Sequence, residues 1–466
     1  MTLIKSISGI RGTIGGKVGD NLTPVDAVKF ASAYGTFLKA GSGTLEEGRK
    51  LKVVIGRDAR ISGPMIHNLV MNTLLGLGID VIDLGLSTTP TVEIAVPLEK
   101  ADGGIILTAS HNPKQWNALK LLNAKGEFLS GKEGELILEI AESEAFDFSD
   151  VDSLGTITVN DAYMDIHIDE VLNLPLVDAE AVAKKKFKVV VDGVNSSGGI
   201  IIPKLLEQMG VACVKLYCEP NGHFPHNPEP LKEHLGDICK LVVDEQADFG
   251  IVVDPDVDRL AFISNDGEMF GEEYTLVACA DYVLSKTPGN TVSNMSSSRA
   301  LRDITNKYNG SYQASAVGEV NVVTLMKSTN AIIGGEGNGG IIYPESHYGR
   351  DSLVGVALFL THLASLNMTV AELRASYPQY YMSKNKIELT PQIDVDAILV
   401  AMTEKYKNEE INTIDGVKID FATEWVHLRK SNTEPIIRIY TEAPTQADAD
   451  VLALRIIEEI KAIAGI

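Results

Sequence analysis

An internal repeat constrains the fold of this chain more than any other sequence feature. Residues 52–63 (KVVIGRDARISG) resemble residues 188–199 (KVVVDGVNSSGG): each has a β-branched strand, a polar turn and a Ser-Gly pair that opens a helix. The following strands repeat in the same order, with residues 78–84 matching 210–216 and residues 101–110 matching 247–256 without a gap. A repeated strand–helix unit of this kind is typical of related α/β domains.

A weaker third copy ends in residues 330–337 (NAIIGGEG), whose two isoleucines stand where Val252 and Val253 stand in the second copy. By this register Ser110, Asp256 and Glu336 occupy the same place, just past the C-terminal end of an equivalent strand. Ligands of open α/β sheets bind beyond the carboxyl ends of the strands. We therefore expect three polar loops to line one cleft.

Strands of continuous Val and Ile alternate with helical segments, the first opening at Thr23-Pro24, which indicates parallel α/β units. After about Tyr377 the pattern changes to a helix-like segment (393–407), three short strands (417–421, 425–429 and 435–440) and a helix capped by Thr445. We predict an α/β fold of three similar mixed α/β domains around one cleft, plus a smaller C-terminal α+β domain. The expected domain ranges are 1–150, 151–258, 259–376 and 377–466.

Composition and charge restrict the class of protein. The 466 residues include 41 Lys and Arg against 63 Asp and Glu, a net charge of −22 without a basic tract, so neither nucleic acid nor a membrane is an expected partner. No apolar run approaches the roughly 18 residues of a membrane span, and the N-terminal residues lack the apolar core of a secretory signal. Four cysteines without CxxC spacing disfavour a zinc site or a disulfide framework. We expect a soluble cytoplasmic protein.

The first candidate motif is ILTASHNP (106–113), which places Ser110 on a loop that leaves a buried strand. One interpretation is a structural turn, because Ser, Asn and Pro are turn residues. The other is an exposed serine that carries a phosphoryl group. In the second case Lys120 would supply a nearby amine, which can act as a general acid or base where its surroundings lower its pKa.

The second motif is VVDPDVDR (252–259), in which Asp254, Asp256 and Asp258 alternate and therefore share one side of an extended segment. Three like charges so close together repel one another unless a cation holds them, and ligands that are all oxygen suit Mg²⁺. The alternative is a solvated acidic turn, but the strand that precedes it is too apolar for a freely exposed run. The motif predicts a magnesium site.

Two further loops have residues suited to binding a sugar phosphate. The segment GGEGNGG (334–340) is either a flexible surface loop or a site where Glu336 and Asn338 bind sugar hydroxyls. The segment LRKSNTEPIIR (428–438) gathers arginines, hydroxyls and turn amides, which suit phosphate oxygens. A solvated basic turn is the alternative interpretation of this second segment.

In this order, TASHNP, DPDVDR, GEGNGG and RKSNTEP resemble the motifs of the α-D-phosphohexomutase superfamily, which includes phosphoglucomutase/phosphomannomutase and phosphoglucosamine mutase. The resemblance covers essentially the whole chain. It implies the architecture of four domains described above. It also implies an isomerase, an intramolecular phosphotransferase that interconverts hexose 1-phosphate and 6-phosphate through a phosphoserine enzyme and a 1,6-bisphosphate intermediate.

The resemblance also implies the roles of individual residues. Ser110 would be the phosphorylated serine and Lys120 the general acid/base, with His111, Arg11 and Arg259 completing the catalytic group. Mg²⁺ would be held by phosphorylated Ser110 with Asp254, Asp256 and Asp258. Substrate would be bound by Glu336, Asn338, Arg429, Ser431, Asn432, Thr433 and Arg438. The implied cofactors are Mg²⁺ and a hexose 1,6-bisphosphate, the partners are small sugar phosphates, and we expect a monomer or a homodimer.

Departures from the family pattern leave the substrate open. Many members carry a histidine where Gly340 stands, and His347 is a candidate substitute for that imidazole. Asn432 resembles the phosphoglucomutase/phosphomannomutase branch, since typical phosphoglucosamine mutases carry Gly there, but phosphoglucosamine mutase stays an alternative. More remote alternatives are a sugar phosphatase with Asp254 as nucleophile, as in haloacid-dehalogenase enzymes, and a non-catalytic sugar-phosphate sensor.

Overall fold

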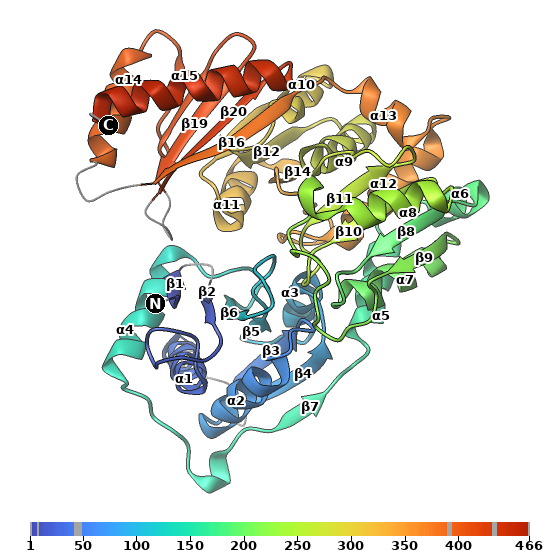
Figure 1. Ribbon diagram of the computed structural model, residues 1–466. Helices are drawn as coiled ribbons and strands as arrows, with labels where there is room; N and C mark the ends of the chain where they lie inside the picture. The colour runs from blue at the N-terminus through green and yellow to red at the C-terminus, as the bar shows by residue number, and fades with distance from the viewer. Residues whose placement is uncertain (1, 7–8, 42–48, 389–393, 431–435, 465–466) are drawn as a thin grey trace. The chain divides into compact units, whose positions relative to one another are not determined.

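The computed structural model describes residues 2–6, 9–41, 49–388, 394–430 and 436–464 of the chain (Figure 1). Its contacts divide the chain into two compact units. Unit 1 comprises Met1–Thr275 and Gly339–Ala371, and unit 2 comprises Leu276–Asn338 and Glu372–Ile466. The chain therefore leaves unit 1 and returns to it once before unit 2 is completed.

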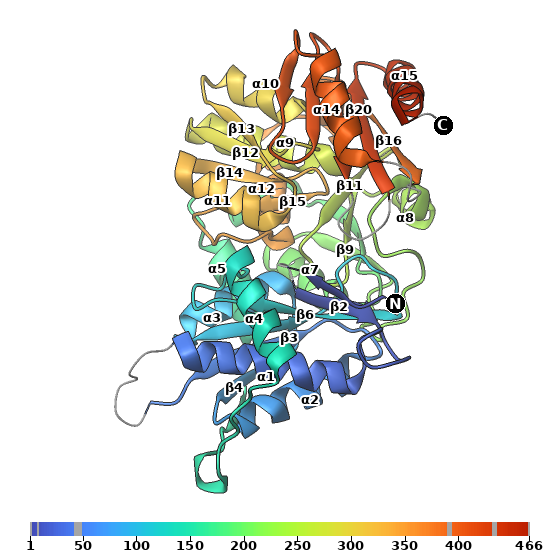
Figure 2. The same ribbon diagram turned by 90° about the vertical axis from the view of Figure 1, so that its left-hand side faces the viewer.

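The first sheet of unit 1 has the strand order β1-β2-β6-β5-β3-β4-β7. Its strands are β1 (Ile4–Ser6), β2 (Gly9–Thr13), β3 (Lys52–Arg57), β4 (Asp80–Leu86), β5 (Gly103–Leu107), β6 (Trp116–Leu122) and β7 (Ile157–Val159). Alternate residues of a strand face opposite sides, so Val53 and Ile55 pack on one side and Val54 on the other. The first side is covered by α1 (Pro24–Gly41), α2 (Gly63–Gly76) and α4 (Gly131–Ser143), and the second by α3 (Thr89–Leu98) and α5 (Tyr163–Leu172) (Figure 2).

The second sheet of unit 1 has the order β11-β10-β8-β9, with β8 (Lys188–Asp192), β9 (Ala212–Leu216), β10 (Phe249–Val253) and β11 (Leu260–Ser264). Helix α8 (Gly236–Asp244) packs on one side through Ile238 and Val242. On the other side the ring of Phe359, from α12 (Ser352–Ser365), stacks on Phe262 with centroids 3.9 Å apart. Unit 1 also holds α6 (Ala179–Lys185), α7 (Gly198–Gln208), β15 (Gly340–Ile342) and the short 3-10 helices Val151–Ser153 and Lys232–His234. The antiparallel hairpin β10–β11 continues past residue 258, so the second sheet includes residues that the sequence analysis assigned to the third segment.

Unit 2 contains a parallel set of strands and an antiparallel sheet. The parallel set is β12 (Asn290–Asn294), β13 (Tyr312–Ser315) and β14 (Ala331–Glu336), with α10 (Ala300–Lys307) and α11 (Glu319–Thr329). The antiparallel sheet has the order β16-β20-β19-β18-β17: β16 (Tyr381–Glu388), β17 (Glu410–Asn412), β18 (Val417–Asp420), β19 (Trp425–Lys430) and β20 (Ile436–Ala443). Helices α14 (Val395–Lys405) and α15 (Gln446–Ala464) supply apolar side chains to its core. Helices α9 (Glu272–Lys286) and α13 (Val370–Ser376) each cross from unit 1 into unit 2 along the chain.

The predicted repeat is confirmed by the strand pairing. Strands β3, β8 and β12 each lie between two parallel neighbours, namely β4 and β5, β9 and β10, and β13 and β14. One detail of the register is wrong: Ser110 and Asp256 lie beyond the ends of β5 and β10, but Glu336 is itself the last residue of β14. Strand β16 was not predicted, because its alternating side chains are mostly polar or partly exposed and form no apolar run.

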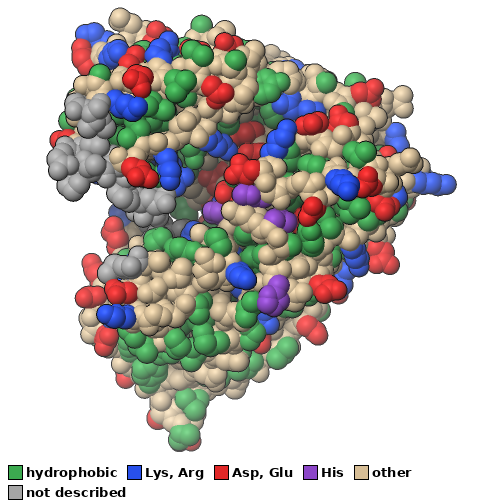
Figure 3. All heavy atoms as spheres, viewed as in Figure 1, with side chains coloured by type: hydrophobic (Ala, Val, Ile, Leu, Met, Phe, Trp, Pro, Cys, Tyr) green, Lys and Arg blue, Asp and Glu red, His purple; other side chains and the backbone are tan. Residues whose placement is uncertain are grey.

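The predicted terminal elements also agree with the structure. Helix α1 begins at Pro24, and Thr445 caps α15 by accepting the N–H of Asp448 at 3.1 Å. None of the described helices is by itself long and apolar enough to cross a membrane, although the bent pair α12 and α13 passes that test together by length and composition. On the face of the molecule in Figure 3, acidic and basic side chains of the described residues are interspersed.

Candidate active site

The loop that follows β5 places Ser110 against the acidic motif of the second sheet. Strand β5 is buried along its whole length, and Ser110 comes three residues after its end with only 4% of its surface exposed. The serine has a positive φ of 47°, a conformation that non-glycine residues rarely adopt. Its Oγ donates a hydrogen bond to Oδ2 of Asp254 at 2.8 Å. Two loops predicted from separate motifs are therefore in direct contact within unit 1.

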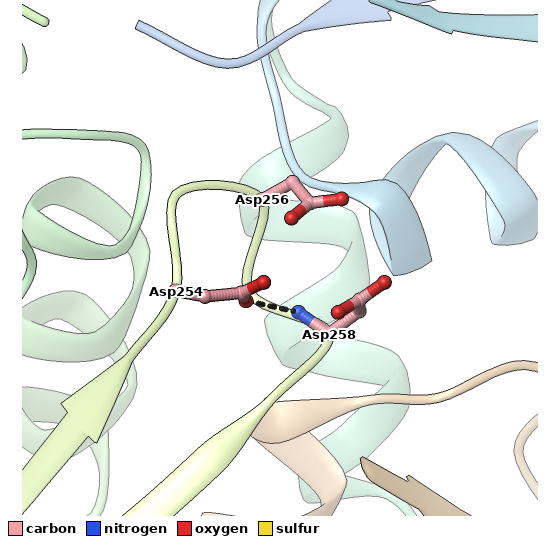
Figure 4. Close-up of side chains that lie close together, drawn as sticks. All are labelled: Asp254, Asp256 and Asp258. Atoms are coloured by element: carbon pink, nitrogen blue, oxygen red, sulfur yellow. Dashed lines mark hydrogen bonds between the residues drawn. The ribbon is translucent and has the colours of Figure 1, made fainter. Parts of the chain in front are cut away.

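The three aspartates of the second motif converge on one point between β10 and β11 (Figure 4). All three are fully buried, and each offers a carboxylate oxygen within 4.8 Å of the others. Oδ1 of Asp254 accepts the backbone N–H groups of Asp258 and Arg259, both at 3.1 Å, which closes the loop. Oδ1 of Asp256 and Oδ1 of Asp258 are buried without a hydrogen-bond partner among the described residues. Buried carboxylate oxygens of this kind fit a hard divalent cation such as Mg²⁺.

Cationic side chains surround these carboxylates. Nζ of Lys120, on β6, lies 2.6 Å from Oδ2 of Asp256 and 3.3 Å from Oδ2 of Asp258. Burial alone would lower the pKa of Lys120, but the two carboxylates raise it above its ordinary value. Burial would likewise raise the pKa of Asp258, but Arg350, Lys120 and Arg259 lower it. Among the described residues no ion pair of this kind is formed by Asp254, and burial together with its two acidic neighbours raises its pKa.

Three further predicted residues contact Ser110 or the loops on either side of it. Nδ1 of His111 lies 3.4 Å from Ser110 Oγ, and burial together with Arg259 and Arg11 lowers the pKa of His111 well below its ordinary value. Arg11, on β2, donates to Oδ1 of Asn112 at 3.1 Å. Nη1 of Arg259 donates to Oε1 of Glu229 at 3.1 Å, whereas its buried Nε has no partner among the described residues. The structure thus brings all the residues predicted for catalysis and for metal binding together in unit 1.

Sequence reasoning missed three residues that contact this group. Arg350 donates to Oδ2 of Asp258 at 2.7 Å, and Glu229 accepts from Arg259. Thr89, at the start of α3, donates its hydroxyl to Oδ2 of Asp256 at 2.5 Å and its N–H to the carbonyl of that aspartate at 2.9 Å. Their partners lie 30 to 167 positions away in sequence, so only the fold reveals these contacts.

The two residues predicted to bind sugar hydroxyls, Glu336 and Asn338, lie in unit 2. Glu336 is 5% exposed, and its Oε1 accepts Nδ2–H of Asn294 at 2.8 Å and the N–H of Gly318 at 3.0 Å. Asn338, two residues further on, is partly exposed. Glu336 is therefore held in a defined orientation by neighbouring loops of the same unit, rather than lying on a freely moving surface loop.

The predicted phosphate site lies at the end of the β19–β20 hairpin. Of its predicted residues, Ser431, Asn432 and Thr433 lie outside the described residues. Arg429 and Arg438 are directly opposite each other on β19 and β20, and Lys386 is opposite Arg438 on β16. Directly opposed residues share a face, and like charges in that position destabilise a sheet. A row of three cations across three strands suits an anion, and Lys386 is a member of it that the sequence analysis missed.

His347 occupies a polar network in unit 1. Its Nε2 lies 3.2 Å from Oδ2 of Asp351, and its Nδ1 lies 3.4 Å from Oε2 of Glu93. The same oxygen of Asp351 lies 2.8 Å from Nε2 of His167. Both ring nitrogens of His347 therefore face carboxylates. A role of His347 in place of the imidazole missing at Gly340 stays a prediction.

The fold and this constellation define a class of enzyme, the phosphohexomutases. Family models of "Phosphoglucomutase/phosphomannomutase" match the chain in order: α/β/α domain I over residues 3–148, domain II over 165–267, domain III over 271–381 and the C-terminal domain over 386–459. The chain belongs to the phosphoglucomutase/phosphomannomutase family of the α-D-phosphohexomutase superfamily, and it is an enzyme of the isomerase, or intramolecular phosphotransferase, type.

Relatives with this architecture differ in the substrate that they are named for. The chain is 36% identical over 456 residues to a phosphoglucomutase/phosphomannomutase of Thermococcus kodakarensis, covering 96% of this chain and 98% of the relative. It is 33% identical over 466 residues to a phosphoglucosamine/phosphogalactosamine mutase of Sulfurisphaera tokodaii, covering 98% and 97%. It is 30% identical to a probable phosphoglucosamine mutase of Methanopyrus kandleri, covering 95% and 94%.

Solved structures share the fold. A phosphoglucomutase/phosphomannomutase family protein of Burkholderia thailandensis superimposes with a TM-score of 0.85 at 24% identity, covering 99% of this chain and 98% of the other. A putative phosphomannomutase of Thermus thermophilus gives a TM-score of 0.81 at 24% identity, covering 98% and 99%. The predicted fold class and the predicted superfamily are both confirmed.

Proposed function

We propose that this phosphohexomutase interconverts hexose 1-phosphates and hexose 6-phosphates through phosphorylated Ser110 and a hexose 1,6-bisphosphate. The contact between Ser110 Oγ and Asp254 Oδ2 at 2.8 Å carries this proposal. It sets the hydroxyl of Ser110, which has a positive φ, beside three converging carboxylates, and two of these carboxylates are paired with Lys120. The site therefore combines a hydroxyl that can accept a phosphoryl group, three carboxylates that can hold a cation, and an amine that can carry a proton.

The proposed reaction needs two phosphoryl transfers. In the first, the bond between phosphorus and Ser110 Oγ breaks, and a bond forms from phosphorus to the free hydroxyl oxygen of the sugar. The hydroxyl proton passes to Lys120 in its neutral amine form, and Ser110 Oγ leaves as an alkoxide. The bisphosphate then turns around. In the second transfer, the other sugar oxygen leaves phosphorus and takes a proton from Lys120, while phosphorus rejoins Ser110 Oγ. The two transfers together regenerate the phosphorylated form of Ser110.

The chain's own residues supply most of what these transfers require. Phosphoryl transfer is catalysed mainly by positioning and by positive charge around the equatorial oxygens. Arg259 and Arg11 would face the phosphoryl group on Ser110, and neutral His111 would lie beside it. Mg²⁺ held by Asp254, Asp256 and Asp258 would supply further positive charge. By binding the carboxylates that raise the pKa of Lys120, it would also lower that pKa, so that the amine can accept a proton.

Binding of the non-reacting end of the substrate is proposed for unit 2. Glu336 and Asn338 would contact sugar hydroxyls, and Arg429 and Arg438 would bind the second phosphate together with Ser431, Asn432 and Thr433. The opposed arginines support this assignment, because two guanidinium groups on one face of a sheet suit the oxygens of a phosphate; Arg429 also lies 3.6 Å from Asp415. Lys386 would add a third positive charge at the same site.

For the substrate, we propose glucose and mannose phosphates, as in the phosphoglucomutase/phosphomannomutase named for Thermococcus kodakarensis. Glucosamine phosphate is the second candidate, because relatives of similar identity are named phosphoglucosamine mutases. We further propose four domains at 1–150, 151–258, 259–376 and 377–466, with β11 counted with the second domain because it pairs with β10. We also propose that the protein acts in the cytoplasm as a monomer or a homodimer. The net charge of −22 supports the absence of nucleic-acid and membrane partners.

A coupled assay tests the reaction. Glucose, mannose and glucosamine 1-phosphates are compared with Mg²⁺ and a catalytic amount of glucose 1,6-bisphosphate, and Ser110→Ala is the matched variant. We expect a 6-phosphate product that depends on Ser110, and the highest kcat/KM identifies the substrate. Release of inorganic phosphate without isomerisation would instead favour the phosphatase, and binding of sugar phosphate without any turnover would favour the sensor.

A further inference from the structure

The guanidinium of Arg60 is fully buried beneath the Ser110 loop. Arginine has five N–H donors in a fixed planar arrangement, and all five find an acceptor here. Nε donates to Oδ2 of Asp58, and the two terminal nitrogens donate to four backbone carbonyls at distances between 2.5 and 3.0 Å. These carbonyls belong to Ser110, Asn112, Pro113 and Trp116. One side chain therefore holds the backbone of the whole serine loop.

Only arginine can make this set of contacts. Lysine carries three donors on a single nitrogen and cannot reach four carbonyls spread along seven residues of loop. The loop also needs an external support, because Ser110 has a positive φ, which persists in a side-chain-bearing residue only where its surroundings impose it. The position of Ser110 Oγ follows from that backbone conformation.

Asp58 supports the N-terminal side of Ser110, through Thr108. Its Oδ1 accepts the N–H of Arg60 at 2.9 Å, and its Oδ2 accepts both Nε–H of Arg60 and the hydroxyl of Thr108, the latter at 2.7 Å. Oγ1 of Thr108 in turn accepts the N–H of Ser110 at 2.9 Å. The N–H and the C=O of the serine are thus both held, one through Thr108 and the other by Arg60.

The turn that carries Arg60 also contacts the acidic loop. The N–H of Ala59 donates to Oγ of Ser196 at 3.2 Å, and that hydroxyl donates to the carbonyl of Pro255 at 2.7 Å. Pro255 lies between Asp254 and Asp256. Residues 58–60 therefore connect the backbone of the serine loop with the backbone of the aspartate loop, all within unit 1.

We propose that Arg60 is a positioning residue of the phosphoryl-transfer reaction. With Asp58, it holds the Ser110 loop in the one conformation that directs Oγ at the three aspartates. This inference rests on the proposed function, since it assigns Arg60 a task in the same reaction. Arg60 does not touch the reacting atoms; its effect on the reaction passes through the backbone of residues 110–116.

The test compares Arg60→Lys with Arg57→Lys in the full-length protein. Arg57 is the last residue of β3, just before the same turn, and it donates to the carbonyl of Asp58 at 3.1 Å, but none of its described contacts is with the serine loop. Three quantities are measured well below the melting temperature of each variant. They are the hydrogen exchange of peptides covering residues 108–117, the fraction of Ser110 phosphorylated by glucose 1,6-bisphosphate, and kcat and KM with the best sugar phosphate.

For Arg60→Lys we expect faster exchange confined to residues 108–117 and a kcat lowered about 100-fold, because a displacement of about 1 Å at a reacting group costs that much. KM should change far less. Arg57→Lys should match the wild type in exchange and kcat. A lower melting temperature with wild-type exchange and wild-type kcat would show a purely structural role and would overturn the proposal.

Two further arms keep the test decisive. If Arg60→Lys does not fold, Thr108→Val is used instead: it removes the acceptor for the N–H of Ser110 and the hydroxyl that donates to Asp58, and it should give the same pattern with a smaller fall in kcat. Wild-type exchange and kcat in that variant would contradict the proposal. If the wild-type protein converts no sugar phosphate, the proposed function fails, whereas the exchange of residues 108–117 still decides whether Arg60 holds the loop.

Discussion

Replacement of Thr89 by valine tests how the protein prepares its candidate cation site. Thr89 is fully buried, and its hydroxyl donates to Oδ2 of Asp256 while its N–H holds the carbonyl of the same residue. Valine has nearly the same shape as threonine but lacks the hydroxyl. The substitution should therefore leave the packing of α3 intact and remove one hydrogen bond to a carboxylate of the aspartate loop.

The expected size of the effect follows from the charge of the acceptor. A hydrogen bond to an ionised group contributes about 1.5–3 kcal/mol. At about 1.4 kcal/mol per factor of ten, a loss of that size weakens an equilibrium roughly 10- to 100-fold. The same range, about 10- to 100-fold in metal affinity, is typical of residues that orient metal ligands without touching the metal. We expect Thr89→Val to weaken Mg²⁺ binding by a factor in this range.

The assay is calorimetric titration of Mg²⁺ into the purified protein, with the Mg²⁺ dependence of turnover as a second measurement. Thr91→Val is the matched control: Thr91 is equally buried on the same helix, but its hydroxyl contacts Thr88 and His167 instead of the aspartates. That control should bind Mg²⁺ as the wild type does. Unchanged Mg²⁺ affinity in Thr89→Val, or an equal loss in both variants, would refute the reasoning.

Three other predictions concern turnover, acid stability and the core. Lys120→Met should lower kcat by about 100- to 10,000-fold, the contribution of a general acid/base, and steady-state kinetics with the best sugar phosphate measures it. Asp351→Asn should lower the free energy of unfolding above pH ~4. Burial alone would raise the pKa of Asp351, but His167 and His347 lower it, so the folded state favours the ionised carboxylate that asparagine lacks. Its carboxylate therefore stabilises the fold above its unfolded-state pKa of about 3.9 and loses that effect as the pH falls, so urea unfolding should show the difference from wild type shrinking in acid. Phe359→Ala should cost about 3–5 kcal/mol in urea unfolding, because its fully buried ring contacts three other phenylalanines; a loss below 1 kcal/mol would contradict the packing.

The parts of the site that could be predicted are those written as short runs of residues. Asp254, Asp256 and Asp258 alternate within five residues, and Ser110 lies in a turn whose counterpart in the repeat is the aspartate loop. Both features can be recognised in the sequence because each depends only on residues that are neighbours along the chain. The same holds for the repeat itself, since β-branched strands and glycine-marked turns recur in the same order.

The parts that could not be predicted are single residues whose partners are distant in sequence. Arg350 contacts Asp258 across 92 positions, and Thr89 contacts Asp256 across 167. A lone arginine or threonine has no spacing from which such a contact could be inferred. Arg60 lies in a repeated segment, and the equivalent position in the second copy is Ser196, a short uncharged side chain. The repeat therefore indicated a turn at this position, but not a side chain that supports the serine loop.

The division of the chain into two units could also not be predicted from the sequence. The segment 339–371 returns to unit 1 because α12 packs its apolar side chains against the second sheet, including Phe359 on Phe262. Sequence patterns indicated a third α/β segment as a whole, because nothing in its periodicity distinguishes a helix that packs on its own sheet from one that packs on the preceding sheet.

Transfer of a phosphoryl group through Ser110 is the central claim, and a pulse–chase measurement tests it most directly. The protein is incubated with radiolabelled glucose 1,6-bisphosphate, the label is located by peptide mapping, and unlabelled hexose phosphate is then added. We predict label on the peptide that contains Ser110, its absence in Ser110→Ala, and its quantitative passage to hexose phosphate in the presence of Mg²⁺. Label on Asp254, or label on Ser110 that does not pass to the sugar, would contradict the mechanism.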